Sequence, residues 1–280
     1  MNNRLELIRK WGRKNIKIIV PLFFFVIIIL IFLFVNYIKE SGTDETVTAT
    51  DPQVVASTEA ATQEETQDSH INMVRSRITG MWIPAATADN VPVAVMYSNV
   101  EEAMPQSSIS SADIIYEAIV EGNITRLCAV FENGTTLNKI GPVRSCRSYY
   151  LFFAKEFEAL YVHFGYSEYA EEYLQMSKMH GLDGMVYCNF FRSDDRVAPH
   201  NAYTSWNGII ESAVYKGYSQ QYPQGYAAPF SFNQDDKHDI QITNGMACTT
   251  FYPGFTFNDP WFSYNEDDGM YYRYQSGKMQ

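Results

Sequence analysis

The chain has 280 residues and a formal net charge of −11, and this charge is distributed unevenly. Residues 1–17 carry six cations and one glutamate, a net charge of +5, which leaves −16 for the other residues. An acidic body excludes proteins that bind nucleic acid through bulk charge, because phosphate neutralisation requires a basic surface. With 46% apolar and 15% aromatic residues the chain can bury a core, which excludes disorder as its main state.

Residues 18–38 form an apolar segment directly after the basic head. No charged residue occurs from Ile18 to Val35, and 21 helical residues span about 31 Å, close to a hydrocarbon core of about 30 Å. The alternative is a cleaved signal peptide, but the segment is long for one and no small-x-small site follows it. We therefore expect a single-pass signal anchor in the cell membrane, with residues 1–17 in the cytoplasm and the C-terminal domain outside.

Residues 39–70 are predicted to form a disordered acidic, Thr-rich stalk. From residue 40 onward this segment holds eight acidic residues, seven threonines and no lysine or arginine. Such a composition cannot bury enough apolar surface to offset its ordering entropy. The rest of the chain is expected to form an extracytoplasmic α/β domain over 71–225 and a β-rich region over 226–280. The α/β domain should combine a mixed sheet, a β-hairpin and packed helices.

The hairpin is expected over residues 113–121 and 124–132, two β-type runs separated by Gly122-Asn123. Two residues of this kind indicate a type II′ turn. In that register Glu117 lies diagonally opposite Arg126, within reach of long side chains, on a half-covered face of the sheet. The two residues then form either a structural ion pair or a pair that positions Arg126 beside a ligand.

Arg144 and Arg147 flank Ser145, which is expected to cap a buried helix over 149–157. Cations are disfavoured at a helix N-terminus, so two arginines there indicate an anion that they bind. That anion is an external phosphate or carboxylate, or the protein's own Glu117 or Glu121; simple exposure of both arginines is the third interpretation. The predicted ligand-binding residues are Arg126, Arg144, Ser145, Arg147 and Asn201.

Two histidines stand in positions where chemistry is common. His163 ends a predicted strand over 158–164, before a helix expected over 167–179, and ligands gather at strand C-termini in α/β sheets. His200 precedes a helix capped by Thr204 or Ser205, and Asn201 is a candidate to orient its ring. The alternatives are a core histidine and a loop brace. Glu117, His163 and His200 are thus the catalytic candidates.

The four cysteines, Cys128, Cys146, Cys188 and Cys248, show no CxxC motif and no metal-ligand spacing. We therefore expect no metal site and no cofactor. The sequence does not choose among the three full disulfide pairings. Cys146 lies between two arginines, which would lower its pKa, so a nucleophilic role is a further hypothesis.

Several of these segments also form one ordered series of motifs. They are Pro92–Met96, Pro105–Ser107, Ala112–Ala118, Glu121-Gly122, Ile124–Arg126, Ile140–Ser145, Arg147, Tyr149-Tyr150, Tyr161–His163, Pro199–Asn201 and Tyr203. Over residues 75–215 the chain resembles the N-terminal domain of the YerB-like lipoproteins. The resemblance implies a bacterial envelope protein with no established activity.

The resemblance also implies a second, C-terminal domain. Trp261–Tyr264, the Asp267–Gly269 turn and Tyr271–Arg273 look like its opening hairpin, so residues 226–280 are interpreted as a partial, truncated domain. The chain departs from the family pattern at its start, where members carry a lipid-attachment cysteine and this sequence carries the apolar segment.

Two functions remain in view. The first is a binding or interaction module, without catalysis, for a cell-wall component or an envelope protein. The alternative is an enzyme acting on an anionic envelope substrate, bearing phosphate or carboxylate, through the arginines near the helix start. Neither involves nucleic acid.

Overall fold

The computed structural model describes residues 70–187, 189–233 and 244–280. The predicted basic head, the transmembrane anchor and the stalk up to residue 69 lie outside these residues. Within the described part of the chain, no helix is both long and apolar enough to cross a membrane.

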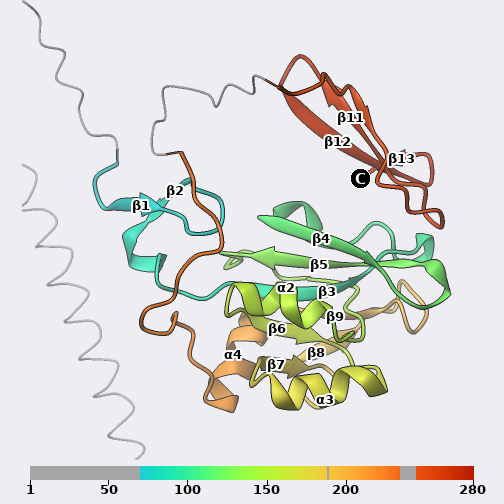
Figure 1. Cartoon of the computed structure of the whole chain (residues 1–280). Helices are drawn as coiled ribbons and strands as arrows, with labels where there is room; N and C mark the ends of the chain where they lie inside the picture. The colour runs from blue at the N-terminus through green and yellow to red at the C-terminus, as the bar shows by residue number, and fades with distance from the viewer. Residues whose placement is uncertain (1–69, 188, 234–243) are drawn as a thin grey trace, which may run out of the picture. The chain divides into compact units, whose positions relative to one another are not determined.

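The centre of the α/β domain is a five-stranded mixed sheet with the order β4-β5-β3-β6-β7 (Figure 1). Strand β3 pairs antiparallel with β5 and parallel with β6, so the sheet changes direction at its central strand. The predicted α/β class with a mixed sheet is thus confirmed. The strands are β3 (Val93–Ser98), β4 (Ile114–Ile119), β5 (Thr125–Phe131), β6 (Leu160–His163) and β7 (His180–Asp183).

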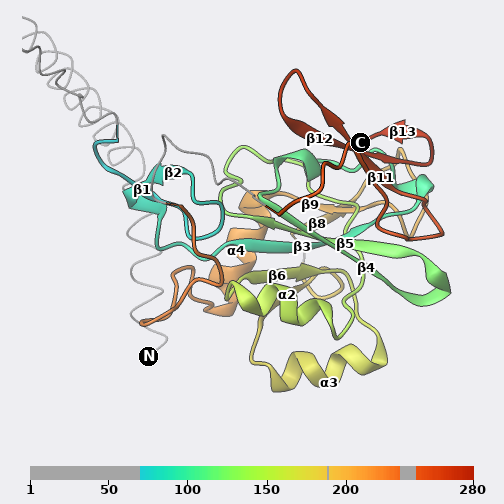
Figure 2. The ribbon, with the colours of Figure 1, turned by 45° about the horizontal axis from the view of Figure 1, so that its top comes forward.

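Helices cover both faces of this sheet. On one face α2 (Tyr150–Glu156) and α3 (Glu168–Met176) supply Tyr150, Ala154 and Ala170 to a buried cluster. On the other face α4 (Trp206–Lys216) buries Trp206 and Ile209 against the sheet. Figure 2 shows α2 and α4 on opposite sides of the strands.

The sequence accounts for these helices locally. The predicted helices over 149–157 and 167–179 are confirmed as α2 and α3, and Ser205 caps α4 by accepting a hydrogen bond from the Gly208 amide at 3.1 Å. Gly217 ends α4 in the left-handed conformation at φ 69°, which glycine adopts without a Cβ clash.

The β4–β5 hairpin is confirmed, but its turn is not the predicted two-residue turn. Glu121–Asn123 form a 3-10 turn, closed by a 2.7 Å hydrogen bond from the Val120 amide to the Ile124 carbonyl. The register is therefore shifted, and Ala118 rather than Ile119 lies opposite Arg126. A shift of one residue moves side chains to the other face of a sheet.

This shift overturns the predicted pairing of Glu117 with Arg126. Glu117 lies opposite Leu127, so it shares a face with Leu127, and Arg126 points to the other face. The prediction of a half-covered face fits β4, where Glu117 is half-buried and Ile119 is exposed, but it does not fit β5. Every residue of β5 is buried, because α2 packs on one face of the sheet and α4 on the other.

Smaller elements complete the described structure. The Asp267–Gly269 turn joins β11 and β12, as expected. These two strands belong to a four-stranded antiparallel sheet with the order β10-β11-β12-β13. The bounds are β1 (Met73–Arg75), β2 (Trp82–Pro84), β8 (Phe190–Arg192), β9 (Ala202–Thr204), β10 (Thr250–Phe251), β11 (Trp261–Asn265), β12 (Met270–Gln275) and β13 (Lys278–Met279), with 3-10 helices at Ala85–Thr87, Glu101–Ala103 and Ile109–Ser111.

Candidate functional site

The segment 143–146 occupies the place where β3 and β6 separate. The two strands pair up to Val95 and Val162. Beyond this point the Arg144 amide donates to the Met96 carbonyl at 2.9 Å, and the Phe164 amide donates to the Arg144 carbonyl at 3.0 Å. Arg144 therefore lies between the carboxyl ends of two parallel strands, the edge at which open α/β sheets bind ligands.

Two further predicted residues, Arg126 and His200, reach the same edge. Arg126 is the second residue of β5 and lies opposite Ser98, the last residue of β3. The guanidinium of Arg144 donates to the Pro199 carbonyl at 3.1 Å, and Ser98 Oγ lies 3.1 Å from His200 Nδ1. We call Arg126, Arg144 and Arg147 the arginine cluster.

Arg126 is the most deeply placed member of the cluster. Its side chain donates to the Ser145 carbonyl, and the residue is only 5% exposed. No carboxylate of the described residues lies within ion-pair distance of it. Burial, together with the neighbouring positive charges of Arg147 and Arg144, lowers its pKa to about 10. A buried cation without a carboxylate costs folding free energy.

Arg147 has an internal partner. It forms a two-pronged ion pair with Glu121, with Nε at 2.6 Å from Oε1 and a terminal nitrogen at 2.7 Å from Oε2. This pairing lowers the pKa of Glu121. The internal-carboxylate interpretation thus applies to Arg147, whereas Arg126 and Arg144 keep their positive charges uncompensated.

The predicted helix N-terminus at Ser145 is wrong. Helix α2 begins at Tyr150 after Tyr149, without a side-chain cap, and spans only seven residues. Ser145 contributes its carbonyl to Arg126 instead of capping the helix. The arginines therefore gather because an irregular segment is inserted between two strand ends, a tertiary arrangement that helix-capping rules do not anticipate.

Glu117 is fully engaged away from the arginine cluster. One carboxylate oxygen accepts hydrogen bonds from Asn99 at 2.9 Å and Thr125 at 2.7 Å, and the other pairs with Arg273 of β12 at 2.9 Å. The Asn258 amide donates to Thr125 in the same network at 3.2 Å. Glu117 thus joins the central sheet to the C-terminal strands.

His163 is a core histidine. It is 2% exposed, and its Nδ1 lies 2.9 Å from the Gly165 carbonyl and 4.0 Å from Asp183 Oδ1. Burial lowers its pKa, and the Asp183 carboxylate opposes part of this effect. Asp183 also accepts the Gly165 amide at 2.7 Å, so both side chains hold the turn that follows β6.

His200 is half-buried at the cluster edge, and burial together with Arg144 lowers its pKa. Asn201 does not orient it. Its amide oxygen accepts from Arg192 at 2.6 Å and its nitrogen donates to Ser193 at 3.3 Å, so Asn201 braces the 192–201 loop. Ser98, the partner of His200, was not predicted. The available signal was a serine directly after the apolar run of residues 93–97.

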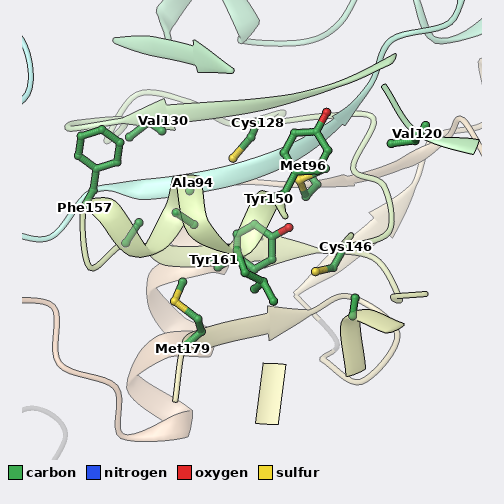
Figure 3. Close-up of a cluster of buried hydrophobic side chains, with 14 of the residues drawn as sticks. Ala94, Met96, Val120, Cys128, Val130, Cys146, Tyr150, Phe157, Tyr161 and Met179 are labelled. Atoms are coloured by element: carbon green, nitrogen blue, oxygen red, sulfur yellow. The ribbon is translucent and has the colours of Figure 1, made fainter. Parts of the chain in front are cut away.

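Cys146 lies inside the core, as Figure 3 shows, beside Tyr161. Burial raises the pKa of its thiol to about 11, which outweighs the lowering by Arg147 and Arg126. The hypothesis of an activated nucleophile is therefore wrong. Among the described residues, Cys128, Cys146 and Cys248 are free thiols.

Comparison with known proteins identifies the family of this domain. A family model for the N-terminal domain of DUF3048 proteins, a family of unknown function, matches residues 78–219. The chain belongs to the DUF3048 family. It is 36% identical over 147 residues to a Bacillus subtilis (strain 168) protein named "Putative lipoprotein YerB". This match covers 52% of the chain and 44% of YerB, so the chain aligns with less than half of that relative.

The crystal structure of YerB from Bacillus subtilis is similar to the DUF3048 chain, with a TM-score of 0.62 at 28% identity. The similarity covers 74% of this chain and 68% of that one. The family resemblance expected from the ordered motifs is thereby confirmed.

Proposed function

We propose that this DUF3048 protein is an extracytoplasmic component of the bacterial envelope that binds an anionic group of a cell-wall component or envelope protein. The binding site is the arginine cluster at the carboxyl edge of β3 and β6. Membrane attachment is assigned to residues 18–38, whose length and basic N-terminal flank suit a signal anchor. A relative named as a lipoprotein supports the envelope assignment.

The observation that carries the proposal is the uncompensated charge of Arg126 and Arg144. Three guanidinium groups face one carboxylate, Glu121, which is already engaged by Arg147. A buried arginine without a carboxylate partner lowers the stability of the folded chain unless a ligand supplies the negative charge. Phosphate and carboxylate groups match guanidinium geometry through paired, charge-assisted hydrogen bonds.

Binding is favoured over catalysis because most catalytic candidates have other roles. Glu117 is held by Asn99, Thr125 and Arg273. His163 is enclosed in the core, and the pKa of Cys146 is raised. Only His200 remains near the arginines with part of its surface open.

The test uses the full chain in detergent micelles and two phosphate-bearing probes. These are a polyprenyl phosphate and wall fragments, the latter assayed before and after removal of their phosphate polymers. Arg144→Ala is expected to weaken binding at least about tenfold, the effect of losing a charge-assisted contact of about 1.5–3 kcal/mol. The matched control is Arg77→Ala, which removes an arginine paired with Asp89 elsewhere on the surface. Unchanged binding in both Arg144→Ala and Arg147→Ala would refute the site.

The anchor is tested separately by fractionation. Cells carrying a C-terminally tagged chain should hold it in the membrane fraction at full size, accessible to external protease. Recovery at the size of a cleaved product would contradict the assignment of residues 18–38.

A second candidate function is an enzyme acting on the same anionic ligand. The observation in its favour is the 3.1 Å contact between Ser98 Oγ and His200 Nδ1, beside Arg144. A lowered pKa keeps this imidazole neutral near pH 7, which suits a general base. The enzyme function would be favoured if the wild type turns over polyprenyl phosphate and Ser98→Ala loses turnover but still binds the substrate. Absence of turnover by the wild type would exclude the enzyme function for that substrate.

A further inference from the structure

A cavity of about 390 Å³ lies at the opposite edge of the central sheet from the arginine cluster. Its wall includes Val91, just before β3, and Leu160, the first residue of β6. The arginine cluster lies at the other end of these strands, beyond Ser98. Six residues of β3 separate the two edges by about 17–20 Å at about 3.3 Å per residue. We call this space the Trp206 cavity.

The floor of the Trp206 cavity is apolar and comes mainly from α4. Trp206 and Ile210 line it together with Val91 and Leu160. The volume falls within the range of about 300–1,000 Å³ typical of small-molecule sites. Trp206 is largely buried, so only the margin of its indole lines the cavity, and with the aliphatic side chains it gives an apolar wall for the C–H groups of a sugar ring.

The rim is built from side chains with unused hydrogen-bonding groups. Asn90, Asn207, Glu211 and Gln220 line the cavity. Within the described part of the chain, none of their side chains forms a hydrogen bond or ion pair. Amides and carboxylates are the groups that donate to and accept from hydroxyls at fixed positions.

The Trp206 cavity differs from the arginine cluster in the charge of its lining residues. Among the described residues that line it, two are glutamates, Glu132 and Glu211, and none is lysine or arginine. A phosphate would meet two carboxylates and no cationic side chain among these residues. The ligand that fits an apolar floor, an amide rim and a mildly acidic wall is rich in hydroxyl groups and carries no negative charge.

Gly134 shows how closely the 133–135 turn approaches Trp206. A Cβ at Gly134 would lie 2.3 Å from Trp206 Cε3, a distance that real side chains do not reach. Glycine therefore allows this turn to pack on the indole, and it brings Asn133 and Thr135 to the cavity rim. The sequence Asn133-Gly134-Thr135 therefore forms part of the cavity wall.

We propose that the Trp206 cavity is a saccharide-binding site for an uncharged sugar unit, such as the N-acetylhexosamines of a cell wall. This proposal does not rest on anion binding at the arginine cluster. The Trp206 side of the cavity receives the C–H face or acetyl methyl of the sugar. The free amides of Asn90, Asn207 and Gln220 and the Glu211 carboxylate hydrogen-bond its hydroxyls.

The test is isothermal titration of the full chain in detergent micelles with N-acetylglucosamine trimer, with maltotriose as a second sugar and alanyl-lysine as a peptide probe. Saturable binding of either sugar is expected. Asn207→Ala and Glu211→Gln should each weaken it about fivefold, the effect of one lost hydrogen bond of about 1 kcal/mol. Both changes are on the solvent-exposed side of α4, so folding should be retained.

Matched controls are Gln175→Ala and Glu172→Gln, which make the same kinds of change on the exposed side of α3. These controls and Arg144→Ala should bind sugar as the wild type does. The proposal is overturned if neither sugar binds saturably, if only alanyl-lysine binds, or if Asn207→Ala and Glu211→Gln leave sugar affinity unchanged. Loss of sugar binding in Arg144→Ala would also overturn it, since the sugar would then occupy the arginine cluster.

Discussion

Two regions at the same hairpin balance charge in opposite ways. On one face of the sheet, Glu117 has a partner for each carboxylate oxygen, and its ion pair with Arg273 is largely buried. On the other face, Arg126 is 5% exposed and has only a backbone carbonyl as partner among the described residues. Arg126 is a buried ionic group, and the side chain of Glu117 is 12% exposed.

The contrast separates a structural network from a binding site. A complete network requires nothing from outside and is destabilised when a member is removed. An incomplete network destabilises the folded state, and binding of an external ion of opposite charge offsets this destabilisation. Substitutions at the two places should therefore have opposite consequences for stability and for binding.

The largest effect is expected at Glu117. Glu117→Ala leaves the Arg273 guanidinium without its carboxylate and takes an acceptor from Asn99 and Thr125. It should lower the free energy of unfolding by about 3 kcal/mol, as expected when one member of a largely buried pair is removed. Chemical denaturation followed by tryptophan fluorescence measures this. Glu172→Ala, on an exposed part of α3, is the control; equal stability of the two variants would contradict the account.

Arg126 should behave differently. Arg126→Met removes a desolvated cation and keeps most of its packing volume, so stability should stay within about 1 kcal/mol of the wild type or rise. The same denaturation series measures it. A loss as large as that of Glu117→Ala would show that Arg126 is structural and would remove the contrast.

His163 provides a pH-dependent test of its core role. Its pKa in the folded chain lies below the ordinary 6.5 because burial disfavours the imidazolium. The unfolded chain therefore takes up this proton first, so the stabilisation is complete above about pH 6.5 and is lost as pH falls toward the folded-state pKa. In His163→Gln the decline in stability below pH 6.5 should be shallower. Identical pH profiles would argue against burial as the cause.

The smallest effect on stability is expected at Glu121, whose side chain is 66% exposed. Its lowered pKa places the stabilising contribution above pH 4.5, to be lost as pH falls below that value. Glu121→Gln should cost about 0.5 kcal/mol at pH 7. Because this change frees Arg147, it should tighten phosphate binding, the opposite of Arg144→Ala. Weaker binding in Glu121→Gln would contradict a cluster that acts through net charge.

Several elements of the α/β domain were predictable because they carry a local signal, whereas strands β7, β8 and β9 were not predicted. Runs of β-type residues marked β4, β5 and β6, and Ser205 marked the start of α4. The register of the hairpin was not predictable in this way. Gly122-Asn123 is compatible with a two-residue turn or with the longer 3-10 turn, and one residue of difference decides which face Arg126 occupies.

The candidate site was predictable as a set of residues but not as a geometry. Arg126, Arg144 and His200 do converge on one edge of the sheet, although the proposed cause, a capped helix at Ser145, is wrong. The convergence depends on segment 143–146 lying between two strand ends, a tertiary contact without a sequence motif. The roles of Glu117 and Asn201 likewise depend on partners 156 and 9 residues away in sequence.

The most direct test of the central claim is the affinity of Arg126→Met for polyprenyl phosphate, measured beside its unfolding free energy on the full chain in detergent micelles. The account predicts binding weakened at least about tenfold with stability unchanged or raised. Wild-type affinity in this variant would contradict the claim that the uncompensated charge of Arg126 exists to bind an anion.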